Sequence, residues 1–452
     1  MRKACIDIAF EFPNAWVKLP LLMNLLSRFL TCLIAIPAVH ADVYHVATTG
    51  SDAQGDGSNE HPWAGIQKAL DECAPGDTVL VHAGTYFQRV EWNVSGSAKA
   101  GVITLIGEDG TILSGKGVKG SQLIRVENQS HLRIENLQLV DNSNPKESGA
   151  IILEGSGSHI TISKCRISRC KGKNAVAIGV YGTDAKTPYS DIVIDGNSIT
   201  DCEPAPSEAL VLNGNVTKFA VTNNTILRVN NIGIDFIGGE KDIVNDPAAV
   251  ARDGLCKGNR VSYARSKYGG GYAAGIYVDG GRDIVIEENV VTGCDLGIEI
   301  GAENPKIITS GITVRSNIIY QNDKAGLALG GYDAERGRVL DCRIVSNQFY
   351  QNTQHKKAQA ELWIQHASNN EIRENSFWVE KGKPMAQIYA AGKNNIVNGN
   401  TWFSEEGPEA VTYNWSGQNG RGFSNWQGAS GWSSTGQFAK WTFVPPGEAT
   451  AP

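Results

Sequence analysis

Three acidic side chains stand inside strand-like segments in the middle of the chain. Asp235 lies in "IGIDFIGG", Asp279 lies at the end of "AGIYVDG", and Glu299 lies in "LGIEIGA". An aspartate in a strand opposes β propensity, and burial without a partner is costly. Neighbouring carboxylates can perform acid and base chemistry on glycosidic bonds, and they can also bind calcium. Which of these applies depends on the elements that position the three acids.

These segments belong to an internal repeat of roughly 25 to 35 residues that asparagine marks. Asparagine tolerates left-handed backbone, and its amide can stack in hydrogen-bonded ladders, so each repeat reads as one turn of a coiled sheet. Three short strands per repeat predict an all-β fold, a single-stranded right-handed parallel β-helix. The predicted ladder comprises Asn136, Asn197, Asn224, Asn259, Asn289, Asn317, Asn347, Asn375 and Asn400, with Cys165 filling one step.

The third strand of each repeat can be aligned by its apolar residues, such as Ile234 with Phe236 and Ile298 with Ile300. Since side chains alternate between the two faces of a strand, the residues between them point outward. The first outward column is predicted to contain Ile152, Gly179, Val211, Asp235, Tyr277, Glu299, Ala328, Trp363 and Tyr389. The second is predicted to contain Glu154, Tyr181, Asn213, Ile237, Asp279, Gly301, Gly330, Gln365 and Ala391.

This alignment brings the three acids together on one outer face. Asp235 and Glu299 fall two coils apart, so their Cα atoms are expected about 10 Å apart, with Asp279 on the coil between them. Glycosidases hold two carboxylates about 5 to 9.5 Å apart, which long side chains on such a face can reach. Asp235, Asp279 and Glu299 are therefore the predicted catalytic residues, and the same three are the ligands if calcium is bound.

Residues around the acids predict a groove for a sugar chain. Small residues at Ala328, Gly301 and Gly330 leave the face shallow, and aromatic rings are expected beyond them. An insertion, "GGEKDIVNDPAAVARDG", follows Asp235, and loops on a rigid scaffold often carry binding residues. The predicted substrate contacts are Tyr277, Trp363, Tyr389, Asn213, Gln365 and Asp242.

The coils, together with the segment "YHVATTGSDAQGDGSNEHPWAGIQKALDECAPGDTVLVHAGTY", resemble the secreted right-handed β-helix proteins of the pectate-lyase-like superfamily. The resemblance covers most of the chain and implies a carbohydrate-active enzyme. In one group of its lyases the strand similar to "AGLALGG" carries a basic lysine where this chain has Ala328. That role cannot be transferred, and Tyr277, Lys241, Lys267 or Arg336 would have to replace it.

Both ends of the coil are expected to be capped, because an open end is an exposed sheet edge. Ile66, Ala69, Leu70 and Cys73 follow helical spacing and predict a short N-terminal capping helix. The C-terminal tail is expected to form an irregular cap. Its tryptophans are expected to pack over the last coil, with sugar stacking as the alternative: Trp415, Trp426, Trp432 and Trp441.

The N-terminus predicts export. An apolar run after Arg28 ends in Val39-His40-Ala41, which is typical of a signal peptide cleaved after Ala41 and starting most naturally at Met23. The predicted segments are 1–41 as signal peptide, 42–86 as N-terminal cap with the first coil, 87–402 as β-helix and 403–452 as capping tail. The seven cysteines beyond residue 41 form no CxxC pair, so zinc is not expected, and at most one disulfide is.

Composition agrees with a globular protein, since hydrophobic residues make up 41% of the 452 and the net charge of −6 argues against a nucleic-acid binder. Three hypotheses remain. The first is an exported glycoside hydrolase that needs no cofactor and acts on a polysaccharide or oligosaccharide. The second is a calcium-dependent polysaccharide lyase or uronate epimerase, and the third is a carbohydrate-binding protein without activity, because a fold does not determine function.

Overall fold

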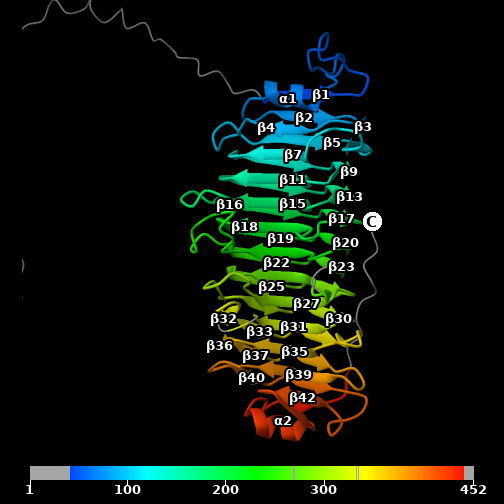
Figure 1. The fold of residues 1–452 in the computed structure, drawn as a ribbon. Coiled ribbons are helices and arrows are strands. Elements are labelled where there is room, and N and C mark those ends of the chain that lie inside the picture. Colours follow the sequence, from blue (N-terminus) through cyan, green and yellow to red (C-terminus); the bar gives the residue numbers. More distant parts are fainter. Residues whose placement is uncertain (1–40, 268–269, 332, 334, 442–452) are drawn as a thin grey trace, which may run out of the picture. The chain divides into compact units, whose positions relative to one another are not determined.

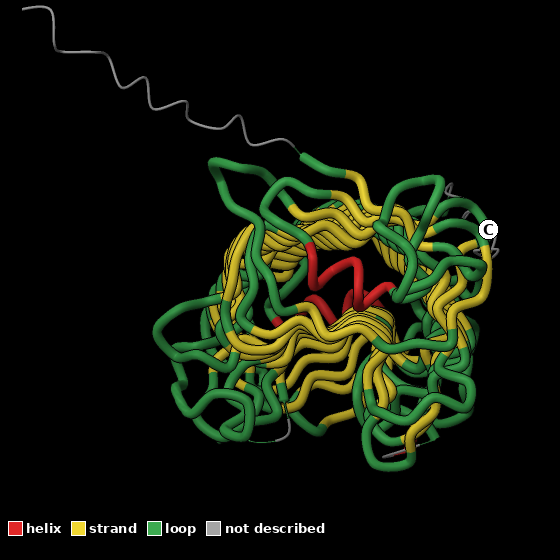
Figure 2. The backbone as a smooth tube through the Cα atoms, turned by 90° about the horizontal axis from the view of Figure 1, so that it is seen from above, coloured by secondary structure: helices red, strands yellow, loops and turns green. Residues whose placement is uncertain are grey.

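The computed structural model describes residues 41–267, 270–331, 333 and 335–441. Three long sheets run side by side along the coil, and the chain visits them in turn (Figures 1 and 2). One sheet runs from β1 (Val43–Val46) to β40 (Ile396–Asn398), and another from β3 (Gly84–Tyr86) to β44 (Gln437–Phe438). The predicted right-handed parallel β-helix is confirmed.

The third sheet, which we call the site sheet, carries the candidate acids on its outer face. Its strands pair in parallel, each with the equivalent strand of the next coil, until an antiparallel hairpin ends the sheet. Its strands are β4 (Val90–Trp92), β7 (Gln122–Glu127), β11 (Ser148–Gly155), β15 (Ala175–Gly182), β18 (Leu210–Gly214), β21 (Ile234–Ile237), β24 (Ala274–Asp279), β27 (Leu296–Gly301), β31 (Ala325–Gly330), β35 (Ala360–Gln365), β39 (Pro384–Tyr389), β42 (Thr412–Trp415) and β43 (Gln418–Arg421).

The register of the site sheet agrees with the predicted columns over most of their length. Asp235 pairs with Tyr277, and Tyr277 pairs with Glu299. Their apolar neighbours in each strand are buried in the core inside the coil, so the acids do face outward. One step was wrong: Trp363 pairs with Gln387, and Tyr389 pairs with Gln365. Tyr389 therefore belongs to the second column, because the β39 strand begins two residues earlier than the sequence alignment assumed.

The predicted asparagine ladder is present at a corner inside the coil. The amide Nδ2 of Asn289 donates to Oδ1 of Asn317 at 2.9 Å, and Asn317 donates in the same way to Asn347. The backbone N–H of Cys165 donates to Oδ1 of Asn197, so Cys165 does fill a step. The prediction for Asn136 was wrong by one residue, because strand pairing aligns the buried Leu137 with Cys165.

A second, shorter ladder ends in a carboxylate. Asn322 donates to Asn352, and Asn352 donates from its backbone N–H and its Nδ2 to the two carboxylate oxygens of Glu361, at 2.5 and 2.9 Å. Glu361 is fully buried, and this burial raises the pKa of its carboxyl to about 8. The inner face of the coil therefore contains a titratable group that has hydrogen-bond partners.

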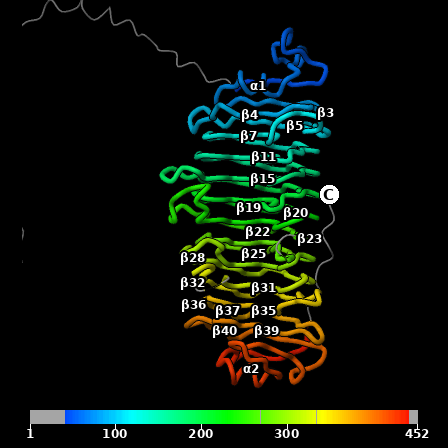
Figure 3. Tube along the Cα trace, viewed as in Figure 1, coloured from blue at the N-terminus to red at the C-terminus, as the bar shows by residue number. Residues whose placement is uncertain are grey.

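Both ends of the coil are capped, as predicted, although the C-terminal cap contains a helix and a hairpin where an irregular segment was expected (Figure 3). The helix α1 (Ile66–Glu72) buries Ile66, Ala69 and Leu70 against the first coil. At the other end α2 (Phe423–Ser430) buries Trp426, which contacts Trp415 and Trp432 edge to face. The tail tryptophans therefore pack against one another and the last coil, and Trp441 packs on Tyr350 and Trp378.

The remaining predictions about the chain concern its cysteines and its N-terminus. In the described part all seven cysteines are buried free thiols. Neither described helix is long and apolar enough to cross a membrane. The predicted signal peptide lies, apart from Ala41, outside the described residues.

Candidate active site

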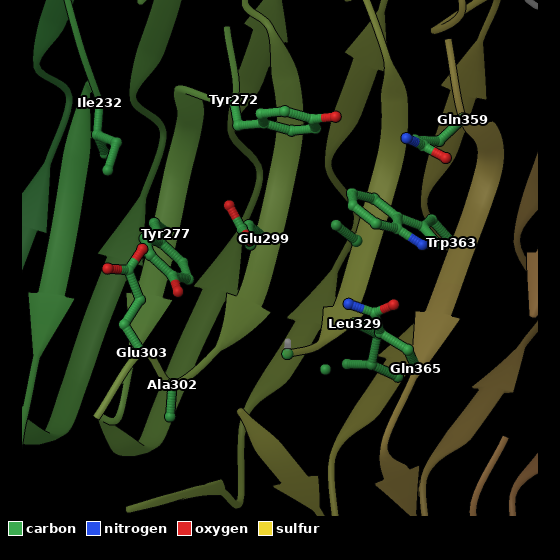
Figure 4. Close-up of a pocket in the computed structure, with 13 residues that line it drawn as sticks. Ile232, Tyr272, Tyr277, Glu299, Ala302, Glu303, Leu329, Gln359, Trp363 and Gln365 are labelled. Atoms are coloured by element: carbon green, nitrogen blue, oxygen red, sulfur yellow. The ribbon is translucent and has the colours of Figure 1, made fainter. Parts of the chain in front are cut away.

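A pocket of about 320 Å³ opens on the outer face of the site sheet, over β24, β27, β31 and β35 (Figure 4). Ala328, Leu329 and Gly330 line its floor, where small residues leave room above the sheet. The functional side chains that line it are Tyr272, Tyr277, Glu299, Glu303, Trp363 and Gln365. Acids and aromatic rings therefore face one small space.

Glu299 is the predicted acid that lines this pocket. It is half-buried, between Tyr277 on one neighbouring coil and Ala328 on the other. Burial raises the pKa of its carboxyl well above the ordinary value, and the neighbouring carboxylates of Glu303 and Asp279 raise it further. A carboxyl in this environment keeps its proton at a pH where an exposed glutamate has lost it.

Glu303 is a second carboxyl at the pocket, and it follows β27 directly. Its backbone N–H donates to Oδ1 of Asp279 at 2.6 Å, which fixes the start of its loop. Loss of hydration and the nearby Glu240 raise the pKa of Glu303. Figure 4 places the Glu303 carboxylate beside Tyr277, on the opposite side of that ring from Glu299. Burial raises the pKa of the Tyr277 hydroxyl, and both carboxylates raise it further.

Asp235 and Asp279 lie behind the pocket and are almost fully buried. One oxygen of Asp235, Oδ1, has no hydrogen-bond partner in the structure. Burial raises the pKa of Asp235 well above the ordinary value, and Glu208 and Asp279 add to the effect. Burial and Glu303 do the same for the pKa of Asp279. Like charges out of water favour the neutral acid, so this layer of carboxyls retains protons.

The aromatic side of the pocket is held by a buried cation. Tyr272 lies 6.3 Å from Trp363, ring centroid to centroid, and the ammonium of Lys324 lies 3.4 Å from the centroid of the Tyr272 ring. Lys324 also donates to the carbonyl of Gly270 at 2.7 Å. Asp295 accepts the backbone N–H of Ala273 on the other side of Tyr272. These contacts fix Tyr272 at the mouth of the pocket.

Within the described ranges, no three or more His, Cys, Asp or Glu side chains are arranged to hold a metal ion. Calcium binding by Asp235, Asp279 and Glu299 therefore stays a prediction, and no step below depends on it.

Comparison with known proteins identifies the family. A family described as "Right handed beta helix region" matches residues 91–247 and 255–431. The chain belongs to this family. It is also similar to "Uncharacterized protein YwoF" of Bacillus subtilis (strain 168), with 31% identity over 388 residues that cover 82% of each chain.

Solved β-helix structures resemble this member of the family in fold. The GH136 lacto-N-biosidase of Eubacterium ramulus matches with a TM-score of 0.52 and 14% identity, over 78% of this chain and 68% of that one. The Family 28 exopolygalacturonase of Yersinia enterocolitica matches with a TM-score of 0.50 and 12% identity, over 79% and 76%. Identities this low establish the shared fold alone.

Among the predicted substrate contacts, the structure places Tyr277, Trp363 and Gln365 in the pocket. It places the other three elsewhere. Asn213 is buried and donates to Glu240 at 2.7 Å, and Asp242 lines a separate cavity of about 620 Å³. Tyr389 is exposed one coil beyond Gln365.

Sequence reasoning missed Glu303, Glu208 and Tyr272. All three stand in loops next to the site sheet, where strand alternation gives no direction to a side chain. The only signal was proximity: Glu303 follows the strand of Glu299 by two residues, and Tyr272 precedes β24 by two. An alignment limited to the strands could not include them.

Proposed function

We propose that this β-helix protein is an exported glycoside hydrolase that cleaves a polysaccharide or oligosaccharide of neutral sugars at the Glu299 pocket. The observation that carries the proposal is that two carboxyls in different environments line one pocket. Glu299 is half-buried and its pKa is raised well above the ordinary value, whereas Glu303 is exposed and its pKa is raised less. Glycosidases need one carboxyl that holds a proton and one that acts as base or nucleophile.

The proposed roles follow from position. Glu299 is the general acid that protonates the departing oxygen, and Glu303 is the base or nucleophile. Asp279 is a positioning residue, because it accepts the Glu303 N–H. Asp235 lies behind Glu299 and Glu303, is almost fully buried, and helps to exclude water from the back of the pocket. Of the three acids predicted to be catalytic, this assignment keeps Glu299 in that role, gives Asp279 and Asp235 supporting roles, and adds Glu303 as the partner of Glu299.

Neutral sugars are favoured by the charge of the pocket. Its described lining contains two carboxyls and no Lys, Arg or His. A uronate carboxylate placed here would lie near the Glu303 carboxylate and would find no cation in this lining to offset it, which is costly. Tyr272 and Trp363 instead offer ring faces, against which the apolar faces of a neutral sugar can pack.

A lyase or epimerase mechanism has less support, since it needs a base for the C5 proton. Burial raises the pKa of Tyr277 well above its ordinary value, so the phenolate is strongly disfavoured. Lys241 lines the separate cavity, Lys267 is exposed outside the pocket, and Arg336 forms an ion pair with Asp333 at 2.9 Å. The fold also carries glycoside hydrolases of families 136 and 28, which is consistent with hydrolysis here.

The test is product release from neutral polysaccharides (xylan, galactan, arabinan, mannan and β-glucan) and from polygalacturonate and alginate. Reducing ends and the ultraviolet absorbance of unsaturated uronates are followed together. We expect reducing ends without absorbance from a neutral polymer, and a loss of about 10²- to 10⁴-fold in Glu299→Gln. Glu405→Gln, an exposed acid near the C-terminal end of the coil, is the matched control. Absorbance from a uronic polymer would establish the lyase, and full activity of Glu299→Gln would refute this site.

A further inference from the structure

The outer face of the site sheet is filled on the N-terminal side of the acids. Val211, one coil before Asp235, is fully buried, and Ile237 is almost so. Both belong to an apolar cluster on the outer face that also includes Ile152 and Val176, with Tyr181 packed against it. A sugar chain therefore has no open face to follow in this direction.

The insertion after β21 covers this side. Glu240 of the insertion accepts the amide of Asn213 at 2.7 Å. The side chains of Ile243 and Val244 lie 3.0 and 3.1 Å from the point where Gly214 would carry a Cβ, so they rest directly on the sheet. The buried carboxyls of Asp235 and Asp279 thus form a closed wall behind Glu299 and Glu303.

The opposite side of the pocket is also bounded. Trp363 packs beside Ala328 of the floor and lies three coils beyond Tyr277. Gln359 and Gln365 line the pocket beside it, as Figure 4 shows. Only three steps of about 4.8 Å each therefore separate the Cα of Tyr277 from that of Trp363. The space is a small pocket of about 320 Å³ and not a through groove.

We infer that the site takes the end of a saccharide chain and releases a terminal mono- or disaccharide. This inference rests on the proposed hydrolase. The interior of a polymer would have to leave the pocket at both ends, which the acid wall and the covering insertion prevent. A chain end needs one exit only, toward the solvent above the pocket. In the reaction the glycosidic C–O bond breaks, water supplies a hydroxyl to the anomeric carbon, and its proton goes to the departing oxygen.

The test uses the neutral polymer cleaved in the panel above, together with its oligosaccharides labelled at the reducing end. Early in the reaction we expect one small product and polymer length that falls slowly as reducing ends rise. The labelled products should be either that small product or chains that have lost a single such unit, with no labelled fragments of intermediate length that have lost several units in one cut. Trp363→Ala removes one side of the pocket and is expected to broaden the product lengths. Phe87→Ala, an exposed aromatic on an early coil, is the control.

The outcomes separate the two proposals. Intermediate fragments and a rapid fall in polymer length in the wild type would overturn the chain-end inference and leave the hydrolase standing. No cleavage of any substrate by the wild type would overturn the hydrolase and this inference with it. An unchanged product pattern in Trp363→Ala would contradict the role of Trp363 as a side of the pocket, and then the inference fails as well.

Discussion

Two regions of the molecule bury polar side chains in rows along the coil, and they differ in whether those side chains have hydrogen-bond partners. In the inner ladder Asn289, Asn317 and Asn347 are fully buried, and each amide has donors and acceptors on the neighbouring coils. On the outer face Asp235 is equally buried, yet one carboxyl oxygen has no partner. Burial with partners stabilises a fold, whereas burial without them has a cost that functional sites often carry.

The largest expected effect on stability comes from the ladder. Asn317→Ala leaves donors of Asn289 and the carbonyl of Ile286 without partners inside the coil. We expect the free energy of unfolding to fall by roughly 3 kcal/mol, the sum of several lost buried hydrogen bonds. Urea unfolding measures it, with the exposed Asn93→Ala as the control. Equal stability of the two variants would show that the ladder is not a source of stability.

Glu361 sharpens the comparison, because it is a carboxylate in the ladder position. Its folded-state pKa of about 8 lies above the ordinary 4.5, so the folded protein binds a proton that the unfolded chain has released. The contribution of Glu361 to the free energy of unfolding is therefore fully present below about pH 4.5, and it is lost as the pH rises toward about 8.

Glu361→Gln removes this titration, since one amide oxygen can accept both donors of Asn352, as Oδ1 does elsewhere in the ladder. We expect the variant to match the wild type near pH 4.5 and to exceed its free energy of unfolding by about 2 kcal/mol or more near pH 8. Denaturant unfolding at both pH values measures the difference. Glu405→Gln serves as the control, and a gain that does not vary with pH would contradict the explanation.

The comparison also explains what the sequence could predict. Asn224 and Asn259 repeat at one corner, and Ile234, Phe236 and Asp235 alternate between faces, so local rules determined the ladder and the outward direction of the acid. At Asn136 and Tyr389 the predicted alignment differs from the observed strand pairing by one and two residues, and nothing in a single sequence indicated the difference. Pocket residues that lie in loops, such as Glu303, are positioned by how the loops fold over the sheet. The alternation of side chains along a strand gives no information about this.

The smallest expected effect concerns a third kind of buried charge, one that is partnered and lies at the site. Lys324 donates to the carbonyl of Gly270 and lies under the Tyr272 ring. Lys324→Met keeps the length of the side chain and removes the cation. A cation–π contact of this kind corresponds to about a twofold to thirtyfold change in an equilibrium constant. If Tyr272 only frames the substrate, KM rises by that factor and kcat stays unchanged, since Lys324 does not touch Glu299. Lys267→Met, at an exposed lysine in the loop that carries Tyr272, is the control. A fall in kcat at constant KM would instead place Lys324 in the chemical step. In that case buried charges that support the pocket could not be separated from those that react in it.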